Sequence, residues 1–290
     1  MDYELMLFDR INIIKDTITK YGEENFYISF SGGKDSTVLH HLIDLALPNN
    51  RIPRVYSNTG IDLIEVTKFV KELALNDDRI IMIKPSLPVK ETLEKYGYPF
   101  KSKLHSYLLE KYQRLGMTIG VRNYLGIGDK PHLRTCPNKL RYQFSEEFNI
   151  KISDKCCLEM KEKPLTKWAK ENNKTIAITG IMIAEGGRRS NSKCFVKVSK
   201  DLSFFNPLSK VSEDFEKWFI EDQKIKLCKL YYPPYNFDRT GCKGCPFALN
   251  LQHELSVLEK FFPNERKQCE LIFKPIYEEY RRINYRLKGK

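Results

Sequence analysis

The stretch FYISFSGGKDSTVL, residues 26–39, decides how the rest of the chain is interpreted. It begins with an apolar, β-prone run, passes through a polar turn with two adjacent glycines, and ends in an apolar run of helical character. Adjacent glycines let the backbone turn tightly and approach an anion, and the first N–H groups of the new helix point at the same spot. The stretch therefore predicts a strand, a phosphate-binding turn and a helix.

Several side chains of this turn suit the oxygens of pyrophosphate. Lys34 brings a positive charge, and the Ser and Thr hydroxyl groups bring hydrogen-bond donors. The alternative is an ordinary strand-to-helix turn that is capped by Ser or Asp. Lys34 and Asp35 are expected to act in catalysis as well as in binding. The residues expected to bind the nucleotide here are Ser31, Gly32, Gly33, Lys34, Asp35, Ser36 and Thr37.

The string Ser-Gly-Gly-Lys-Asp-Ser resembles the PP-loop of the adenine nucleotide α-hydrolase-like superfamily. That superfamily includes N-type ATP pyrophosphatases, the small subunits of ATP sulfurylases, and the reductases of phosphoadenylyl sulfate (PAPS) and adenylyl sulfate (APS). A Walker loop differs, because its glycines are spaced otherwise and its Lys directly precedes Ser or Thr. The resemblance implies that the turn binds an adenine nucleotide.

Composition narrows the class of protein. The chain has 290 residues, of which 41% are hydrophobic and 30% charged, enough to bury a full core. No apolar run reaches the roughly 18 residues of a membrane span, and the first residues lack the pattern of a signal peptide. We therefore expect a cytoplasmic protein with no membrane partner. The formal charge of +12 fits a nucleic-acid partner, an anionic nucleotide or a generally basic proteome.

Apolar periodicity along the chain predicts an α/β fold. Because a strand, a helix and a second strand follow one another around the phosphate turn, a right-handed parallel crossover is expected. The sequence predicts an open, mainly parallel sheet with helices on both faces, as in the adenine nucleotide α-hydrolase-like fold, plus a helical C-terminal segment. The expected strands are 26–30, 54–57, 79–84 and 175–181, and the expected helices are 5–21, 37–47, 63–75, 89–96, 106–115, one after residue 137, 212–223, and two across 249–287 that are broken at Pro263.

Two domains are expected. Residues 1–235 would form the nucleotide-binding α/β domain, with an insertion at about 99–154 that could serve as a substrate lid. Residues 236–290 would hold a loop with a cysteine pair and the C-terminal helices.

Loops at the carboxyl ends of parallel strands line the ligand crevice of an open sheet. The second strand runs into Asn58, Thr59 and Gly60, and the resemblance implies that this loop lies near the nucleotide; a plain turn is the alternative. The fourth strand runs through Gly180 into a glycine-rich loop with Glu185, and both residues are expected to bind the nucleotide, while Arg188 and Arg189 of the same loop are expected to act in catalysis. On that loop, the guanidinium groups of Arg188 and Arg189 offer planar forks that suit phosphate or sulfate, although both could simply face solvent.

Four of the eight cysteines form two pairs. Cys242 and Cys245 are spaced so that both sulfur atoms can face one metal centre, while Cys156 and Cys157 are adjacent. Neighbouring side chains diverge, so an adjacent pair chelates one zinc ion poorly, whereas the separate irons of a [4Fe–4S] cluster can take both. The spacing favours the cluster over zinc or a redox disulfide.

This cysteine pattern also resembles a family motif. Cys-Cys-x-x-x-Lys-x-x-Pro-Leu, followed after roughly eighty residues by Gly-Cys-x-x-Cys, is similar to the cluster motif of assimilatory APS reductases. The resemblance implies that Cys156, Cys157, Cys242 and Cys245 bind a [4Fe–4S] cluster. It also implies that Lys161 lies between cluster and substrate.

The other four thiols are more ambiguous. Cys194, Cys228 and Cys269 are expected to be small core residues. Cys136 lies in Arg-Thr-Cys-Pro, and nearby basic residues could lower its pKa, so it is either a catalytic thiol or a core residue.

The chain departs from the reductases in two respects. Those enzymes attack the sulfur of their substrate with a Cys in a C-terminal Glu-Cys-Gly-Leu/Ile-His segment, which this sequence does not contain. They also generally have degraded PP-loops, whereas this one is intact. The intact loop favours ATP, with Mg²⁺, over APS or PAPS.

We therefore expect ATP-dependent adenylylation of a second substrate, followed by sulfur transfer. The basic charge suits a tRNA or DNA acceptor, and a small acceptor is the other option. A sulfur or thiol donor protein is expected, and the superfamily resemblance implies a homodimer. The alternatives are an APS or PAPS reductase that uses an external thiol or one outside the tail, and a non-catalytic, cluster-bearing nucleotide-binding subunit.

Overall fold

The computed structural model describes residues 2–130, 132–183, 193–199 and 201–288, which belong to two compact units. We call them the sheet unit and the thiol unit. The domain boundary expected between residues 235 and 236 stays a prediction. The sheet unit comprises Met1–Asn58, Asp62–Lys84 and Lys163–Gly241, and the thiol unit comprises Thr59–Ile61, Pro85–Glu162 and Cys242–Lys290.

The sheet unit contains a six-stranded sheet in the order β3-β2-β1-β4-β6-β5. All neighbouring strands are parallel except β5 and β6, which pair antiparallel at one edge. The sheet confirms the mainly parallel α/β fold expected from the sequence. The strands are β1 (Phe26–Phe30), β2 (Arg54–Ser57), β3 (Ile80–Ile83), β4 (Ile176–Ile178), β5 (Phe195–Lys197) and β6 (Ser203–Phe205).

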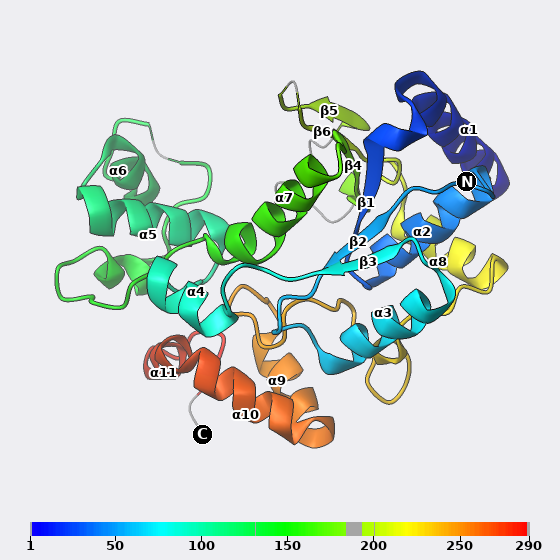
Figure 1. Cartoon of the computed structure of the whole chain (residues 1–290). Coiled ribbons are helices and arrows are strands. Elements are labelled where there is room, and N and C mark those ends of the chain that lie inside the picture. Colours follow the sequence, from blue (N-terminus) through cyan, green and yellow to red (C-terminus); the bar gives the residue numbers. More distant parts are fainter. Residues whose placement is uncertain (1, 131, 184–192, 200, 289–290) are drawn as a thin grey trace. The chain divides into compact units, whose positions relative to one another are not determined.

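Helices cover both faces of this sheet (Figure 1). Because the crossovers from β1 to β2 and from β2 to β3 run in one direction, α2 and α3 lie on the same face, and α1 and α8 pack beside α2. On the opposite face, α7 packs against β2 and β3. The helical segments of this unit are α1 (Tyr3–Tyr21), η1 (Glu23–Asn25), α2 (Lys34–Ala46), α3 (Ile64–Asn76), α7 (Lys163–Glu171), α8 (Glu213–Asp222) and η6 (Lys229–Tyr231).

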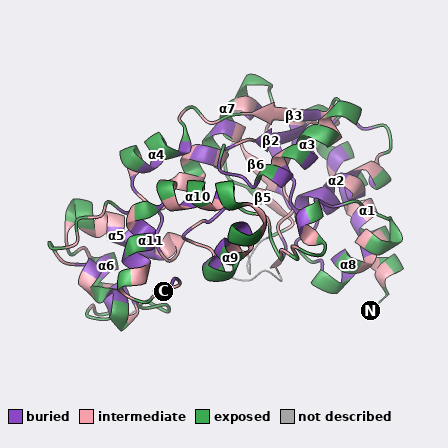
Figure 2. Ribbon diagram, turned by 90° about the horizontal axis from the view of Figure 1, so that it is seen from below, coloured by how far each residue is buried: buried purple, intermediate pink, exposed green. Residues whose placement is uncertain are grey.

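The core lies on each side of the sheet. On one face, Tyr27 of β1, Val55 of β2 and Ala177 of β4 form a buried cluster with Ala169 of α7. On the other face, α2 buries most of its residues, including Leu39 and three more apolar side chains at 0% exposure (Figure 2).

The thiol unit is largely helical within its described residues. It includes an isolated parallel bridge between Tyr98 and Ile152. Two features differ from expectation: residues 119–125 form an additional helix, and the segment after Pro137 is a 3₁₀ helix. The elements are α4 (Val89–Tyr96), α5 (Lys103–Leu115), α6 (Ile119–Leu125), η2 (Asn138–Gln143), η3 (Leu158–Glu162), α9 (Leu251–Phe261), α10 (Pro263–Ile272) and α11 (Lys274–Arg282).

The C-terminal segment corrects one expectation. Three helices follow residue 249, where two were predicted. Pro263 begins α10 at its first position, as predicted, and Pro275 lies in the first turn of α11, where its missing N–H has no intrahelical partner to lose. The second proline therefore starts a further helix.

No helix in the described part of the chain is both long enough and apolar enough to span a membrane.

Candidate functional site

The predicted phosphate turn joins β1 to α2, and its geometry requires glycine at position 32 and is tightly packed at position 33. Gly32 has φ +68°, and a Cβ there would lie 2.6 Å from Cγ2 of Val70. A Cβ on Gly33 would meet Thr240 Oγ1 at 3.3 Å and Tyr231 OH at 3.4 Å. Gly32 therefore has a left-handed backbone conformation that favours glycine, and Gly33 lies against the hydroxyl groups of Thr240 and Tyr231.

The hydroxyl groups of the turn hold the loop itself together. Ser31 Oγ lies 2.9 Å from Ser36 Oγ. Ser36 Oγ and Thr37 Oγ1 both donate to the carbonyl oxygen of Gly33, each at 2.9 Å. Ser36 and Thr37 are also buried. All three hydroxyl groups expected to face phosphate therefore make hydrogen bonds inside the loop, and their ligand-binding role stays a prediction.

Tyr231 and Thr240 were missed by the sequence reasoning. The N–H of Lys34 donates to Tyr231 OH at 2.8 Å, and Tyr231 OH lies 2.7 Å from Thr240 Oγ1. Burial raises the pKa of Tyr231, so the phenol stays protonated at neutral pH. The contact spans 197 residues, and no local pattern in the sequence indicates it.

The ammonium group of Lys34 is paired with a buried carboxylate. Lys34 Nζ lies 2.8 Å from Glu216 Oε2, and the Lys34 side chain is 24% exposed whereas that of Glu216 is fully buried. Burial, followed by the charge of Asp35, raises the pKa of Glu216 to about 7, although Lys34 opposes the shift. Burial alone would lower the pKa of Lys34, but the Glu216 carboxylate outweighs it and raises that pKa. The site thus places one cation beside two carboxyl groups.

The end of β4 lies against the start of α2. A Cβ on Gly180 would be 3.0 Å from the backbone oxygen of Asp35, so the glycine allows close approach of the two elements. Glu185, Arg188 and Arg189, the other residues expected here, lie outside the described residues.

The residues after β2 divide between the units. The N–H of Asn58 donates to the carbonyl of Ile83 at 2.8 Å in the sheet unit. Thr59 and Gly60 belong to the thiol unit, where Thr59 Oγ1 accepts the N–H of Ile61 at 3.3 Å. Their nucleotide-binding role stays a prediction.

All four cysteines of the predicted metal site belong to the thiol unit. Burial raises the pKa of Cys156, and the charges of Cys242 and Cys157 act in the same direction. Burial also raises the pKa of Cys245, and the other three thiols reinforce the shift. The four sulfur atoms are therefore close enough to repel one another as thiolates, which is the environment that a bound cation relieves.

The local structure around these thiols is specific. Cys156 and Cys157 begin a helical segment that continues as the π-helical turn η3, a geometry that is frequent at functional sites. Gly244, between the other pair, has φ +59°, and a Cβ there would lie 2.8 Å from Cys269 Sγ and 2.4 Å from Tyr277 OH. Two lysines, Lys161 and Lys103, partly offset the raised pKa of Cys156.

The remaining thiols show no sign of activation. None of the eight cysteines, all described in the structure, forms a disulfide. Cys136 is 2% exposed, and burial raises its pKa to about 11 although Lys101 and Arg141 oppose the shift. The expectation of a lowered pKa at Cys136 is therefore wrong, because desolvation exceeds the effect of the nearby cations. Cys228 and Cys269 are buried, as expected, and Cys194 is half-buried.

A second titratable cluster lies in the sheet unit. The ligand atoms of His40, Asp44 and Asp77 are within 4.8 Å of one another. However, Arg54 pairs with Asp44 at 2.6 Å, and Arg79 pairs with Asp44 and Asp77, each at 2.8 Å. The carboxylates are thus neutralised by arginines, and the cluster is an ion-pair network between α2, β2 and the end of α3.

Comparison with known proteins places this geometry in a family. The sequence matches the profile of the phosphoadenosine phosphosulfate reductase domain over residues 25–126 and 132–248. An uncharacterised protein of Methanocaldococcus jannaschii is 30% identical over 127 residues, which is 39% of this chain and 30% of that relative.

Among solved structures, an FMN adenylyltransferase from Candida glabrata has a TM-score of 0.50 at 15% identity, covering 83% of this chain and 61% of the other. A PAPS reductase from Candida auris has 0.43 at 14% identity, covering 76% and 88%. A U34-tRNA thiolase from Methanococcus maripaludis, solved with its [4Fe-4S] cluster, has 0.41 at 16% identity, covering 99% and 82%.

The profile match spans most of the chain, including the phosphate turn and all four clustered thiols. It confirms the resemblance inferred from the motifs. The adenylyltransferase match agrees with the α/β fold, at an identity too low to transfer a reaction. The chain belongs to the phosphoadenosine phosphosulfate reductase domain family, within the PP-loop superfamily of adenine nucleotide-binding proteins.

Proposed function

We propose that the protein binds ATP at the phosphate turn, adenylylates an oxygen atom of a second substrate, and then transfers sulfur to that substrate. The observation that carries the proposal is the intact turn, with its left-handed Gly32, its tightly packed Gly33 and the ammonium group of Lys34. An intact pyrophosphate cradle suits an enzyme that releases pyrophosphate.

The first step would be adenylyl transfer. An acceptor oxygen attacks the α-phosphorus of ATP, the bond from that phosphorus to the bridging oxygen breaks, and pyrophosphate leaves. Lys34 and the N-terminus of α2 would stabilise the negative charge on the leaving group. In the second step a sulfide-level donor forms the new bond to sulfur and displaces AMP, without net oxidation or reduction.

Carboxylates beside the turn fit a divalent cation. Asp35 and the buried Glu216 interact with each other next to Lys34, and Mg²⁺ prefers carboxylate oxygens and usually also binds substrate phosphates. Bound Mg²⁺ would supply charge neutralisation for the phosphates. Asp35 is the residue we assign to it, directly or through water.

The thiol set fits an iron–sulfur cluster. Cys156, Cys157, Cys242 and Cys245 would hold it, because they are half-buried, mutually interacting thiols in one unit. A [4Fe–4S] cluster supplies redox-active iron when bound. Lys161 and Lys103 would lower the cost of the negative charge on the ligands.

The alternative is reduction of APS or PAPS, and the family match favours it. That reaction needs a nucleophilic thiolate. Among the described thiols outside the set of four, Cys136, Cys194, Cys228 and Cys269 all have a raised pKa, caused first by burial. A reductase would therefore depend on an external thiol, which makes ATP chemistry the better-supported function.

The test measures both reactions on anaerobically purified protein. We expect exchange of labelled pyrophosphate into ATP when total tRNA is added, and no sulfite release from APS or PAPS with dithiothreitol. Lys34→Gln should lower the exchange rate by about 10²-fold. Lys15→Gln, an exposed lysine of α1 in the same unit, should leave it unchanged. Sulfite release without exchange would establish the reductase instead, and calorimetric binding of ATP without either reaction would indicate a nucleotide-binding subunit.

A further inference from the structure

A group of basic side chains surrounds Cys136 in the thiol unit. Lys101 Nζ lies 3.4 Å from Tyr124 OH, and the carbonyl of Tyr124 accepts the N–H of Cys136 at 2.7 Å. The Arg141 guanidinium would be 3.8 Å from a Cβ on Gly126, the residue two positions after Tyr124. Lys101 and Arg141 therefore both lie close to residues 124–126.

The group includes Arg286 from the C-terminal end. Arg286 donates to the carbonyl of Pro246, which also accepts from Tyr280 OH at 2.9 Å. The same hydroxyl accepts the N–H of Lys101 at 2.7 Å. This chain of contacts connects Lys101 and Arg286, and it ends on the residue that follows Cys245.

The charges of this group are mutually unfavourable. Burial lowers the pKa of Lys101, and the positive charges of Arg286 and Arg134 lower it further, while Cys136 opposes the shift. Within the described ranges, no carboxylate forms an ion pair with Lys101, Arg134, Arg141 or Arg286. Four cations without a partner anion in one region create a strongly positive local potential.

Two of the four basic residues also have an unusual backbone conformation. Lys101 has φ 59° and Arg286 has φ 57°, a left-handed backbone conformation that residues with a Cβ seldom adopt. Such conformations persist where the surrounding structure enforces them, and they cluster at functional sites.

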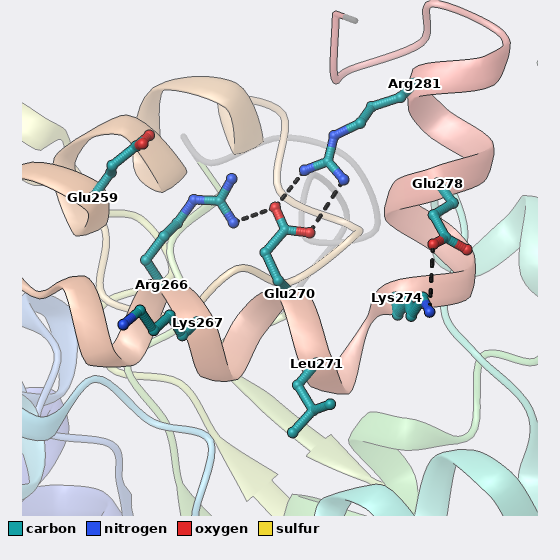
Figure 3. A pocket seen from close by; sticks show the side chains of 8 residues that line it. All are labelled: Glu259, Arg266, Lys267, Glu270, Leu271, Lys274, Glu278 and Arg281. Carbon is teal, nitrogen blue, oxygen red and sulfur yellow. Dashed lines mark hydrogen bonds and ion pairs between the residues drawn. The ribbon is translucent and has the colours of Figure 1, made fainter. Parts of the chain in front are cut away.

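The other basic surface of this unit is different. An open groove of about 540 Å³ runs along α9, α10 and α11, and three of the four basic side chains that line it, all except Lys267, are drawn in ion pairs (Figure 3). Arg266 and Arg281 converge on Glu270, and Lys274 pairs with Glu278 at 3.8 Å. This groove therefore offers a polyanion little unbalanced charge.

We propose that Lys101, Arg134, Arg141 and Arg286 form an anion site that binds the phosphodiester backbone of a nucleic acid strand. Arg134 and Arg141 are exposed, whereas Lys101 and Arg286 are half-buried, so the contacts extend from the interior to the surface. A strand with successive phosphates reaches all four, whereas a single oxyanion reaches few of them. The proposal rests on the proposed function, because it assigns the class of the acceptor.

The test measures binding of a fluorescein-labelled 20-nucleotide single strand, as RNA and as DNA of one sequence, by anisotropy across a salt series. R134Q/R141Q should weaken binding about twentyfold at 0.1 M salt and reduce the slope of log K against log salt by about 1.4, near 0.7 for each lost phosphate contact. K260Q/K267Q removes the same charge from exposed lysines of α9 and α10 in the same unit and should change binding less than twofold.

Each outcome bears on the site. Equal losses in both double variants would overturn it in favour of diffuse charge, and unchanged binding in R134Q/R141Q would overturn it outright. Competition by inorganic phosphate beyond its ionic-strength effect would show that the site takes a single oxyanion, which also overturns the proposal. Calorimetric binding of ATP to wild type and both double variants without nucleic acid reports separately on the nucleotide site of the proposed function, so either idea can fail alone. Tighter binding of RNA or of DNA identifies the kind of strand.

Discussion

The two units handle their cations in opposite ways. The sheet unit has 25 basic and 22 acidic residues, whereas the thiol unit has 24 and 15. Lys34, the cation of the phosphate turn, is paired with the buried Glu216, while the four cations near Cys136 have no carboxylate partner in the described structure. We expect a small ligand such as a nucleotide to bind where a nearby carboxylate already balances the cation. A nucleic acid carries many phosphates, so it binds best to a surface with an excess of positive charge.

We expect iron to bind only in the thiol unit. The largest effect that we predict is therefore the loss of iron when one of its four clustered cysteines is replaced. Cys245→Ser removes one of four mutually interacting thiols. Iron should fall from about four atoms per chain to nearly none, while ATP affinity in the sheet unit stays within about twofold. Iron and sulfide analysis with calorimetric ATP titration measures both.

The matched control for that change is Cys228→Ser, which replaces a buried thiol of the sheet unit. It should keep its iron. Iron retained in Cys245→Ser, or zinc found in place of iron in the wild type, would contradict the cluster assignment.

We expect a change in the phosphate turn to alter ATP binding and leave the iron content of the thiol unit unchanged. Gly32→Ala places a Cβ at φ +68° and 2.6 Å from Val70, so we expect a loss of about 2–4 kcal/mol in unfolding free energy and no measurable ATP binding. Gly241→Ala is the control, because a Cβ there meets nothing within 4 Å. Urea unfolding and calorimetry test this, and iron content should stay normal in both variants. Wild-type ATP affinity in Gly32→Ala would show that the turn does not bind phosphate.

How far the sequence predicts this molecule also differs between the units. The strand limits of β1 and β2, and the limits of α4, follow from local patterns and agree with the structure. The edge pair β5 and β6 was missed because three-residue strands carry too little pattern. In the thiol unit, residues 99–154 show little apolar periodicity, so the sequence did not predict α6.

The site divides in the same way. The glycines and Lys34 form a contiguous motif, and the family match supports their assignment. Glu216 and Tyr231 approach the turn from nearly 200 residues away, so only the fold reveals them. Desolvation was also invisible in the sequence, and it reversed the expected pKa shift of Cys136.

Acid should weaken the thiol unit through His105. This side chain is fully buried between Tyr124 OH at 3.0 Å and Gln143 Oε1 at 2.7 Å, and burial lowers its pKa to about 4. The unfolded chain takes up this proton near pH 6.5, so the stabilisation is fully present above that pH and is lost as pH falls towards 4. The loss should be about 3 kcal/mol.

His105→Gln should flatten that part of the pH dependence in urea unfolding between pH 7 and 4.5. His253→Gln, at an exposed position of the same unit, should leave the slope unchanged. Because burial also lowers the pKa of His40 to about 4, the sheet unit should keep its own acid sensitivity in both variants. An unaltered slope in His105→Gln would show that His105 is not the responsible group.

The smallest effect that we predict comes from removing the carboxylate partner of Lys34, so that this cation, like the four cations near Cys136, has no ion pair within the described part of the chain. Glu216→Gln keeps the shape of the side chain but leaves Lys34 without its carboxylate partner at 2.8 Å. Lys34 would then meet the phosphates of ATP without giving up an ion pair, so ATP affinity should rise about fivefold, equal to about 1 kcal/mol. Glu213→Gln, exposed in the first turn of the same helix, controls for the loss of one negative charge. Calorimetric titration decides between two roles for Glu216: tighter binding means that the carboxylate competes with the nucleotide for Lys34, whereas weaker binding in Glu216→Gln alone means that it orients Lys34 towards the phosphates.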